Sequence, residues 1–139
     1  MTTIAWDGKV LAGDRQRTFG GTPIPVTKVF RQDRYVFGCS GNSDECVLLA
    51  TWLAHGMPVN DKPKCDDVGA LLVRDSKLYY ITSPHLLLLE IDAPFFAIGS
   101  GADYALGAMA MGADAATAVK VAAKLDVNTG MGVDCVTAD

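Results

Sequence analysis

The sequence predicts an α+β fold, a four-layer αββα sandwich in which two sheets pack face to face and helices cover their outer sides. Along the chain the predicted order is strands, one helix, strands, two helices and a final strand. Each sheet needs a second apolar surface for its outer face, and the two helical groups supply one each. No repeat or domain boundary is visible, so we expect residues 1–139 to form one domain.

The first half of the chain is predicted to form two hairpins. Their strands span residues 2–6, 9–13, 26–31 and 35–39. The first hairpin turns at Asp7-Gly8, a dipeptide favoured in tight turns, and it places Thr2 next to Asp14 on the partner strand. Residues 20–25 are expected to form a turn or an edge segment, because proline cannot donate to a sheet ladder.

The second half is predicted to alternate helices with strands. Asn42 or Ser43 can cap a helix over residues 44–55, which ends by Gly56. Two alanine-rich segments with strong helix propensity span residues 100–112 and 114–125. Further strands are expected at residues 68–73, 78–82, 86–91, 95–98 and 131–136.

Composition argues against several classes of function. The net charge is −4, with 12 basic against 16 acidic residues and no basic stripe, so we expect no nucleic-acid partner. The longest apolar run, Leu86 to Leu89, is far too short to span a bilayer. Without a secretory signal we expect a cytoplasmic protein. The four cysteines lack metal-type spacing, so we expect reduced thiols, no metal and no cofactor.

Thr2 becomes the first residue if Met1 is removed, as expected before a small side chain. An N-terminal threonine combines a nucleophilic hydroxyl with an α-amine that can accept its proton. The reference pKa of such an amine is about 7.7–8.0, so it can act as a base near neutrality. Thr2 by itself is equally compatible with an ordinary first strand, so the interpretation depends on the motifs that follow.

Six segments carry a resemblance to a known family. They are Thr-Thr-Ile at 2–4, Ala-Gly-Asp-Arg-Gln-Arg-Thr-Phe-Gly at 12–20, Val-Thr-Lys-Val at 26–29, Ser-Gly-Asn-Ser-Asp at 40–44, Ile-Gly-Ser-Gly at 98–101 and Asp-Val-Asn-Thr-Gly at 126–130. In this order the segments resemble the proteasome β-subunit family of N-terminal-nucleophile threonine peptidases, and most closely its bacterial heat-shock-locus V branch. The resemblance implies the αββα sandwich of that class. The family has two long helices where this chain has one helix and the polar linker 57–67, so the first helical layer is expected to be shortened.

The resemblance implies a set of catalytic residues: Thr2, Asp14, Lys28, Gly41, Ser100, Asp126 and Thr129. Lys28 would lower the proton affinity of Thr2, and a lysine on an inward face needs a carboxylate partner, which Asp14 would supply. Gly41 would present its N–H to the oxyanion, with Gly38 as a weaker candidate. Ser100, Asp126 and Thr129 would support Thr2 by hydrogen bonds. Each residue also has an ordinary interpretation: a solvated lysine, a turn aspartate, a loop glycine or a helix cap.

The family's primary specificity pocket falls on Arg17, Thr18, Val26, Cys39 and Ser43. An arginine there could accept acidic side chains or point to solvent. His55 and His85 have no triad or metal spacing and are interpreted as surface residues.

We therefore expect a threonine-type peptidase subunit of a self-compartmentalising protease that hydrolyses peptides or unfolded proteins. The resemblance implies a homo-oligomeric ring and a possible ATP-dependent unfoldase partner, and no membrane is expected. Trp52, Leu53 and Met57 are the expected apolar ring contacts on the shortened side, together with one face of the helix 102–111. Two alternatives stay open: an inactive scaffold subunit, and a small-molecule amidase of the same class.

Overall fold

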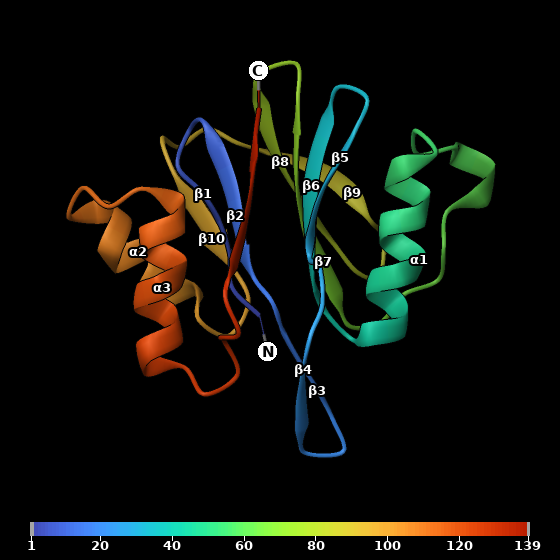
Figure 1. Ribbon diagram of the computed structural model, residues 1–139. Coiled ribbons are helices and arrows are strands. Elements are labelled where there is room, and N and C mark those ends of the chain that lie inside the picture. Colours follow the sequence, from blue (N-terminus) through green and yellow to red (C-terminus); the bar gives the residue numbers. More distant parts are fainter. Residues whose placement is uncertain (1, 139) are drawn as a thin grey trace.

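The computed structural model describes residues 2–138, and its two main sheets face each other with helices on their outer sides (Figure 1). The strands are β1 (Ile4–Trp6), β2 (Val10–Asp14), β3 (Gln16–Phe19), β4 (Thr22–Pro25), β5 (Val29–Gln32), β6 (Tyr35–Gly41), β7 (Val68–Arg74), β8 (Lys77–Thr82), β9 (Leu87–Ile91), β10 (Phe96–Ile98) and β11 (Val133–Thr137). The helices are α1 (Ser43–Ala54), the 3-10 helix η1 (Val59–Asp61), α2 (Ala102–Ala110) and α3 (Ala115–Leu125).

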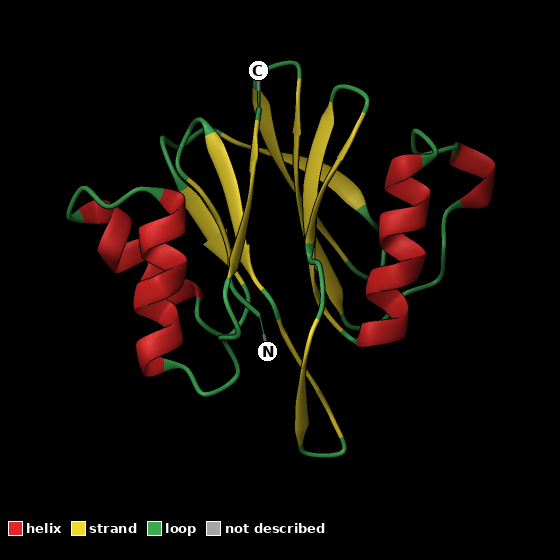
Figure 2. Cartoon of the chain, in the orientation of Figure 1, coloured by secondary structure: helices red, strands yellow, loops and turns green. Residues whose placement is uncertain are grey.

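The two sheets are antiparallel and confirm the predicted αββα sandwich. One has the strand order β10-β1-β2-β11 and is covered by α2 and α3, whereas the other has the order β5-β6-β7-β8-β9 and is covered by α1 (Figure 2). Strand β1 therefore lies inside its sheet, between β10 and β2. The β3–β4 hairpin forms a separate two-stranded unit that projects from one end of the sandwich (Figure 1).

The core follows the two-residue period of the strands. In β1, Ile4 belongs to the cluster between the two sheets, whereas Ala5 belongs to the cluster beneath α2 and α3. In β7, Leu71 lies in the cluster between the sheets and Leu72 lies in the cluster beneath α1. Successive side chains thus face opposite layers, and burying each large apolar side chain stabilises the fold by roughly 1.5–3 kcal/mol.

Helix ends are fixed by side chains that the sequence makes available. Asn42 caps α1 by accepting a hydrogen bond from the N–H of Glu45 at 3.1 Å. Asp114 caps α3 by accepting from the N–H of Thr117 at 2.8 Å, and this bond lowers the pKa of Asp114. Such caps satisfy N–H groups that have no partner within the helix.

Two predictions about local structure were wrong, and one strand was not predicted. Residues 16–19 form β3, a strand that was not predicted. They pair with the proline-containing β4 in a hairpin that lies outside both sheets. Residues 26–28 are not part of a strand, since β5 begins at Val29. Trp52 and Leu53 cannot be ring contacts, because they are only 6% and 0% exposed and lie on the face of α1 that packs against the sheet.

No helix within residues 2–138 is long and apolar enough to cross a membrane.

Candidate active site

Thr2 lies at the start of β1 and is held in place by the backbone around it. The next residue, Thr3, donates its N–H to Asp14 Oδ1 at 3.0 Å, and the N–H of Asp14 donates to the carbonyl of Thr3 at 3.2 Å. The carbonyl of Thr2 accepts from the N–H of Gly101 at 3.3 Å. The β1–β2 register, which pairs Ile4 with Gly13, thereby brings Thr2 and Asp14 to the same end of the sheet.

Lys28 connects the hydroxyl of Thr2 with the carboxylate of Asp14. Its Nζ donates to Thr2 Oγ1 at 2.9 Å and to Asp14 Oδ1 at 2.9 Å. The side chains of Lys28 and Asp14 are 1% and 0% exposed. Burial lowers the pKa of Lys28 below its ordinary value, and the charge and hydrogen bond of Asp14 oppose that shift. A buried ammonium within hydrogen-bond distance favours the ionised form of the Thr2 hydroxyl.

The Asp14 carboxylate is fully engaged. Besides Lys28 and the N–H of Thr3 on Oδ1, it accepts the N–H of Gln16 at 3.2 Å and of Gly130 at 3.1 Å on Oδ2. A buried charge with this many donors is compensated and fixed in orientation. Asp14 therefore positions the Lys28 ammonium.

A second hydrogen-bonded chain leads away from the backbone nitrogen of Thr2. This nitrogen donates to Ser100 Oγ at 3.1 Å, and Ser100 Oγ donates to Asp126 Oδ2 at 2.6 Å. Thr129 Oγ1 also donates to Asp126 Oδ2, at 2.7 Å. Burial alone would raise the pKa of Asp126, but the bonds from Ser100, Thr129 and the N–H of Asn128 outweigh it and lower that pKa. The three residues grouped by the resemblance are thus in direct contact.

Thr3 is also part of this hydrogen-bonded network, and the sequence analysis did not predict a role for it. Its Oγ1 lies 2.8 Å from Thr129 Oγ1, and the residue is fully buried. The Thr2-Thr3-Ile4 segment contained the signal, since a polar residue between a candidate nucleophile and a buried strand needs a partner.

Two glycines leave room for this arrangement. A Cβ at Gly99, whose φ is +100°, would overlap the carbonyl oxygen of Thr2. A Cβ at Gly101 would overlap Thr3 Oγ1 and would lie 3.1 Å from Thr129 Oγ1. Residues 99–101 therefore allow close packing around Thr2 in addition to opening α2.

Gly41 ends β6 with a φ of +123°, and a Cβ there would overlap the carbonyl oxygen of Asp67. It lines a cavity of about 280 Å³ together with Ser40 and Gly99, the residue packed against Thr2. Gly38 lies between the sheets, where a Cβ would come within 3.0 Å of Ile4 and Val29, so packing accounts for it.

A separate cavity of about 180 Å³ borders Lys28. Its lining residues are Arg17, Thr27, Lys28, Phe30, Cys39, Cys46, Val47, Ala50 and Thr51. Of the expected pocket residues, Arg17 and Cys39 line it. Thr18, Val26 and Ser43 do not line it. Thr18 is exposed and follows Arg17 on β3, and Val26 precedes the first lining residue of its segment. Ser43 lies in the first turn of α1, before the helical residues that face the cavity.

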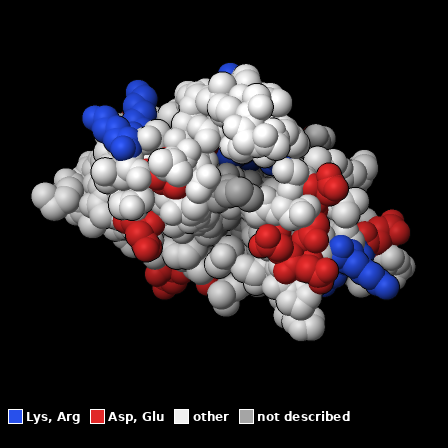
Figure 3. Space-filling model, turned by 90° about the horizontal axis from the view of Figure 1, so that it is seen from below, with Lys and Arg blue, Asp and Glu red and all other residues white. Residues whose placement is uncertain are grey.

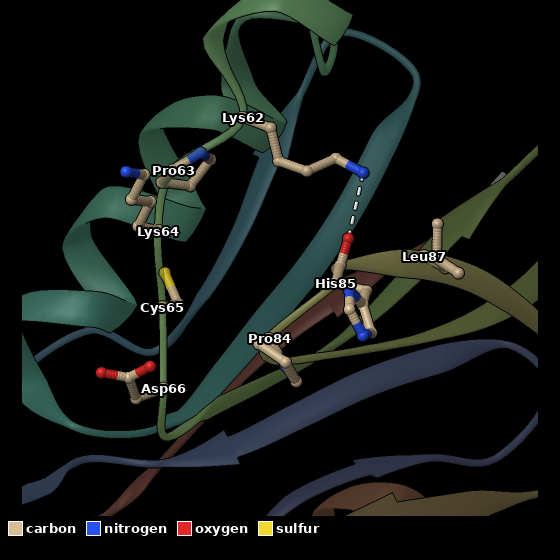
Figure 4. A pocket seen from close by; sticks show the side chains of 8 residues that line it. All are labelled: Lys62, Pro63, Lys64, Cys65, Asp66, Pro84, His85 and Leu87. Carbon is tan, nitrogen blue, oxygen red and sulfur yellow. Dashed lines mark hydrogen bonds between the residues drawn. The ribbon is translucent and has the colours of Figure 1, made fainter.

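A larger cavity, of about 560 Å³, lies elsewhere (Figure 4). It is bounded by residues 62–66 and by Pro84, His85 and Leu87, and Lys62 Nζ donates to the carbonyl of His85 at 3.0 Å. It shares no lining residue with the cavity beside Lys28. Within residues 2–138, no group of three or more histidine, cysteine or acidic side chains is placed to hold a metal ion. All four cysteines are free.

No protein-family model matches the chain, and no curated protein matches it in sequence. Solved structures do match. HslV from Trypanosoma brucei superposes with a TM-score of 0.78 and 22% identity, covering 98% of each chain. BPH from Thiobacillus denitrificans in complex with epoxomicin superposes with a TM-score of 0.75 and 21% identity, covering 98% of this chain and 96% of that one. This chain has the HslV fold. The same BPH without the inhibitor gives 0.73 and 20% identity, over the same shares of the two chains. The likeness to HslV covers 98% of this chain, so it agrees with the sandwich predicted from the sequence.

Proposed function

We propose that this HslV-like protein is a threonine-type peptidase subunit that hydrolyses peptide bonds through Thr2. The observation that carries the proposal is the 2.9 Å hydrogen bond from Lys28 Nζ to Thr2 Oγ1, with Asp14 on the same ammonium. A lysine with no role beyond its strand would be exposed and would not be buried against a carboxylate. A buried ammonium next to the Thr2 hydroxyl is what a nucleophile activated by a neighbouring cation requires.

The proposed reaction starts when Met1, which lies outside the described residues, has been removed and the nitrogen of Thr2 is a free amine. Thr2 Oγ attacks the peptide carbonyl carbon while the amine takes the hydroxyl proton. The C–N bond then breaks and that proton passes to the leaving amine. Water attacks the resulting ester while the amine takes a proton from it. The ester C–O bond then breaks, that proton passes to Oγ, and Thr2 is restored as the carboxylic acid product leaves.

The surrounding residues have defined tasks in this proposal. Lys28 stabilises the developing negative charge on Oγ, and Asp14 holds Lys28 in place. Ser100, bonded to both the Thr2 nitrogen and Asp126, orients the amine. The N–H of Gly41 is the proposed donor to the oxyanion.

The assembly is part of the same proposal. The BPH structure contains epoxomicin, and by analogy Thr2 of this chain would react with that compound. We further propose a cytoplasmic homo-oligomeric ring that takes peptides or unfolded chains, with an ATP-dependent unfoldase as a possible partner. The fold similarity supports the ring, and the shortened helical layer around α1 would alter its contacts.

One experiment separates this proposal from its alternatives. Intact-mass analysis should show loss of Met1 and, after incubation with epoxomicin, a single adduct that is absent from Thr2→Ala. Hydrolysis of fluorogenic peptides should be lost in the same variant. A processed protein that neither binds epoxomicin nor cleaves peptides would be the scaffold subunit. A protein that cleaves small amides but no peptide would be the amidase.

A further inference from the structure

The cavity beside Lys28 contains one positive charge that the buried ion pair does not neutralise. Lys28 is compensated by Asp14 at 2.9 Å. Arg17 also lines the cavity, and no carboxylate within residues 2–138 forms an ion pair with it. Among Arg17, Lys28 and Asp14 the positive charges exceed the negative ones by one, and the Asp67 carboxylate, which acts on Cys46, is not a lining residue of the cavity.

The thiols in the cavity do not cancel that charge. Burial raises the pKa of Cys39 and of Cys46, and the positive charge of Arg17 opposes both shifts without reversing them. Both cysteines therefore stay protonated and neutral near pH 7. Arg17 is half-buried and is one of the residues that line the cavity.

The rest of the lining suits a short acidic side chain. Phe30 and Ala50 offer apolar contact for methylene groups, whereas Thr27 and Thr51 contribute hydroxyls. A guanidinium binds a carboxylate with two parallel N–H donors, a geometry that an amide or an aliphatic group cannot match. A volume of about 180 Å³ accommodates a single side chain.

We propose that this peptidase cleaves preferentially after acidic residues, with Arg17 binding the carboxylate of the residue whose carbonyl Thr2 attacks. This inference rests on the proposed function. Figure 3 shows the end of the molecule at which the β3–β4 hairpin lies, with acidic side chains on both sides of the view. Those acidic groups repel an acidic substrate at long range. The contribution of Arg17 therefore has to be measured as the difference between the wild-type protein and an Arg17 variant.

The test compares three fluorogenic peptides that differ only at the residue before the cleaved bond: Glu, Gln and Leu. For the wild-type protein we expect kcat/KM to be roughly 10- to 100-fold higher for Glu than for Gln, the range for a charge-assisted hydrogen bond. Arg17→Gln should bring this ratio close to one, and Arg17→Lys, which keeps the charge but loses the paired donors, should give an intermediate ratio. Arg34→Gln is the matched control, because Arg34 is exposed and paired with Asp75 outside the cavity. It should leave the ratio unchanged.

Epoxomicin labelling of Thr2 separates the possible failures. Wild-type protein that is labelled but prefers Leu, or shows equal kcat/KM for Glu and Gln, overturns the acidic specificity and leaves the peptidase function standing. Absence of both labelling and cleavage removes the function and the specificity together. If Arg17→Gln is unfolded by circular dichroism, the ratio for Arg17→Lys decides, and an unchanged ratio there overturns the assignment.

Discussion

The Nζ of Lys28 and the Oγ1 of Thr2 lie 2.9 Å apart, although the two residues are separated by 26 positions in the chain. Neither residue is in a strand: Thr2 precedes β1 and Lys28 precedes β5. The contact forms where the two sheets meet, so it depends on the packing of one sheet against the other. Disturbing the sandwich should therefore disturb the reaction centre.

Replacing Thr2 with alanine should remove peptide hydrolysis without unfolding the protein. The variant loses the nucleophile and keeps the amine, so kcat should fall by roughly four orders of magnitude or more. The melting temperature and the oligomer size should stay close to those of wild type. Undiminished turnover of a fluorogenic peptide would exclude the mechanism.

Replacing Lys28 with alanine should be nearly as damaging as losing Thr2, and Asp14→Asn should be milder because the ammonium remains. Lys28→Ala also leaves the Asp14 carboxylate buried without its cation, which should cost roughly 3–5 kcal/mol of stability. Denaturant unfolding measures that cost separately from kcat. Since residues acting as one unit give non-additive losses, the Thr2→Ala/Lys28→Ala variant should be no slower than Thr2→Ala. Near-normal turnover by Lys28→Ala would make Lys28 purely structural.

The pH profile should have an alkaline limit set by Lys28. Because burial lowers the pKa of Lys28, kcat/KM should begin to fall at a pH below the ordinary lysine value of 10.5. Asp14 raises this pKa, so Asp14→Asn should shift the alkaline limb to lower pH. Between the folded and unfolded pKa values the unfolded state binds more protons, so stability contributed by Lys28 increases as pH rises through that window. An alkaline limb that does not move in Asp14→Asn would contradict this assignment.

Gly101→Ala and Gly107→Ala form a matched pair at the start and in the middle of α2. At Gly101 the new methyl group would collide with Thr3 and Thr129, so both activity and stability should fall. At Gly107 nothing lies within 4 Å, and alanine should stabilise the helix by about 0.5–1 kcal/mol. Thermal unfolding and peptide turnover of the two variants would test this. Equal effects at both positions would count against the close packing around Thr3.

If the protein forms a ring, its contacts on the α1 side should use Leu48, which is 50% exposed, and not the buried Trp52. Leu48→Glu should shift the oligomer toward smaller species in native mass spectrometry. Lys77→Glu, at the β7–β8 turn, serves as a surface-charge control and should not. A wild-type monomer at micromolar concentration would remove the ring and leave the amidase or scaffold alternatives.

Local signals in the sequence were sufficient for most of the fold. Asp7-Gly8 placed the first turn, and Asn42 and Asp114 marked where α1 and α3 begin. The limits appear where tertiary packing decides. The helical spacing of Cys46, Leu49 and Leu53 predicted the buried face of α1, and all three are buried. Trp52 is buried on the same face although it was assigned to the surface, because apolar residues at nearly every position from Cys46 to Leu53 left the edge of that face undefined.

The catalytic residues of the candidate site could be predicted from the sequence, whereas the cavity beside them could not be predicted in full. The pairing of Asp14 with Lys28 came from the resemblance, and it agrees with the need of a buried lysine for a carboxylate partner. The cavity could be predicted only in part. Its walls come from β3, residues 27–30, β6 and α1, and the contribution of Val47 and Thr51 depends on how α1 is rotated against the sheet. The rotation of α1 against the sheet cannot be predicted from the spacing of residues along the chain.

The β3–β4 hairpin has a consequence for how such proteins diversify. It carries Arg17 but belongs to neither sheet, and every residue of β4 is exposed. Substitutions there can accumulate without disturbing the core, whereas Thr2, Asp14 and Lys28 are locked inside it. Substrate specificity can therefore change in evolution while the catalytic residues are kept. Related proteins that cleave different substrates should differ first in this hairpin.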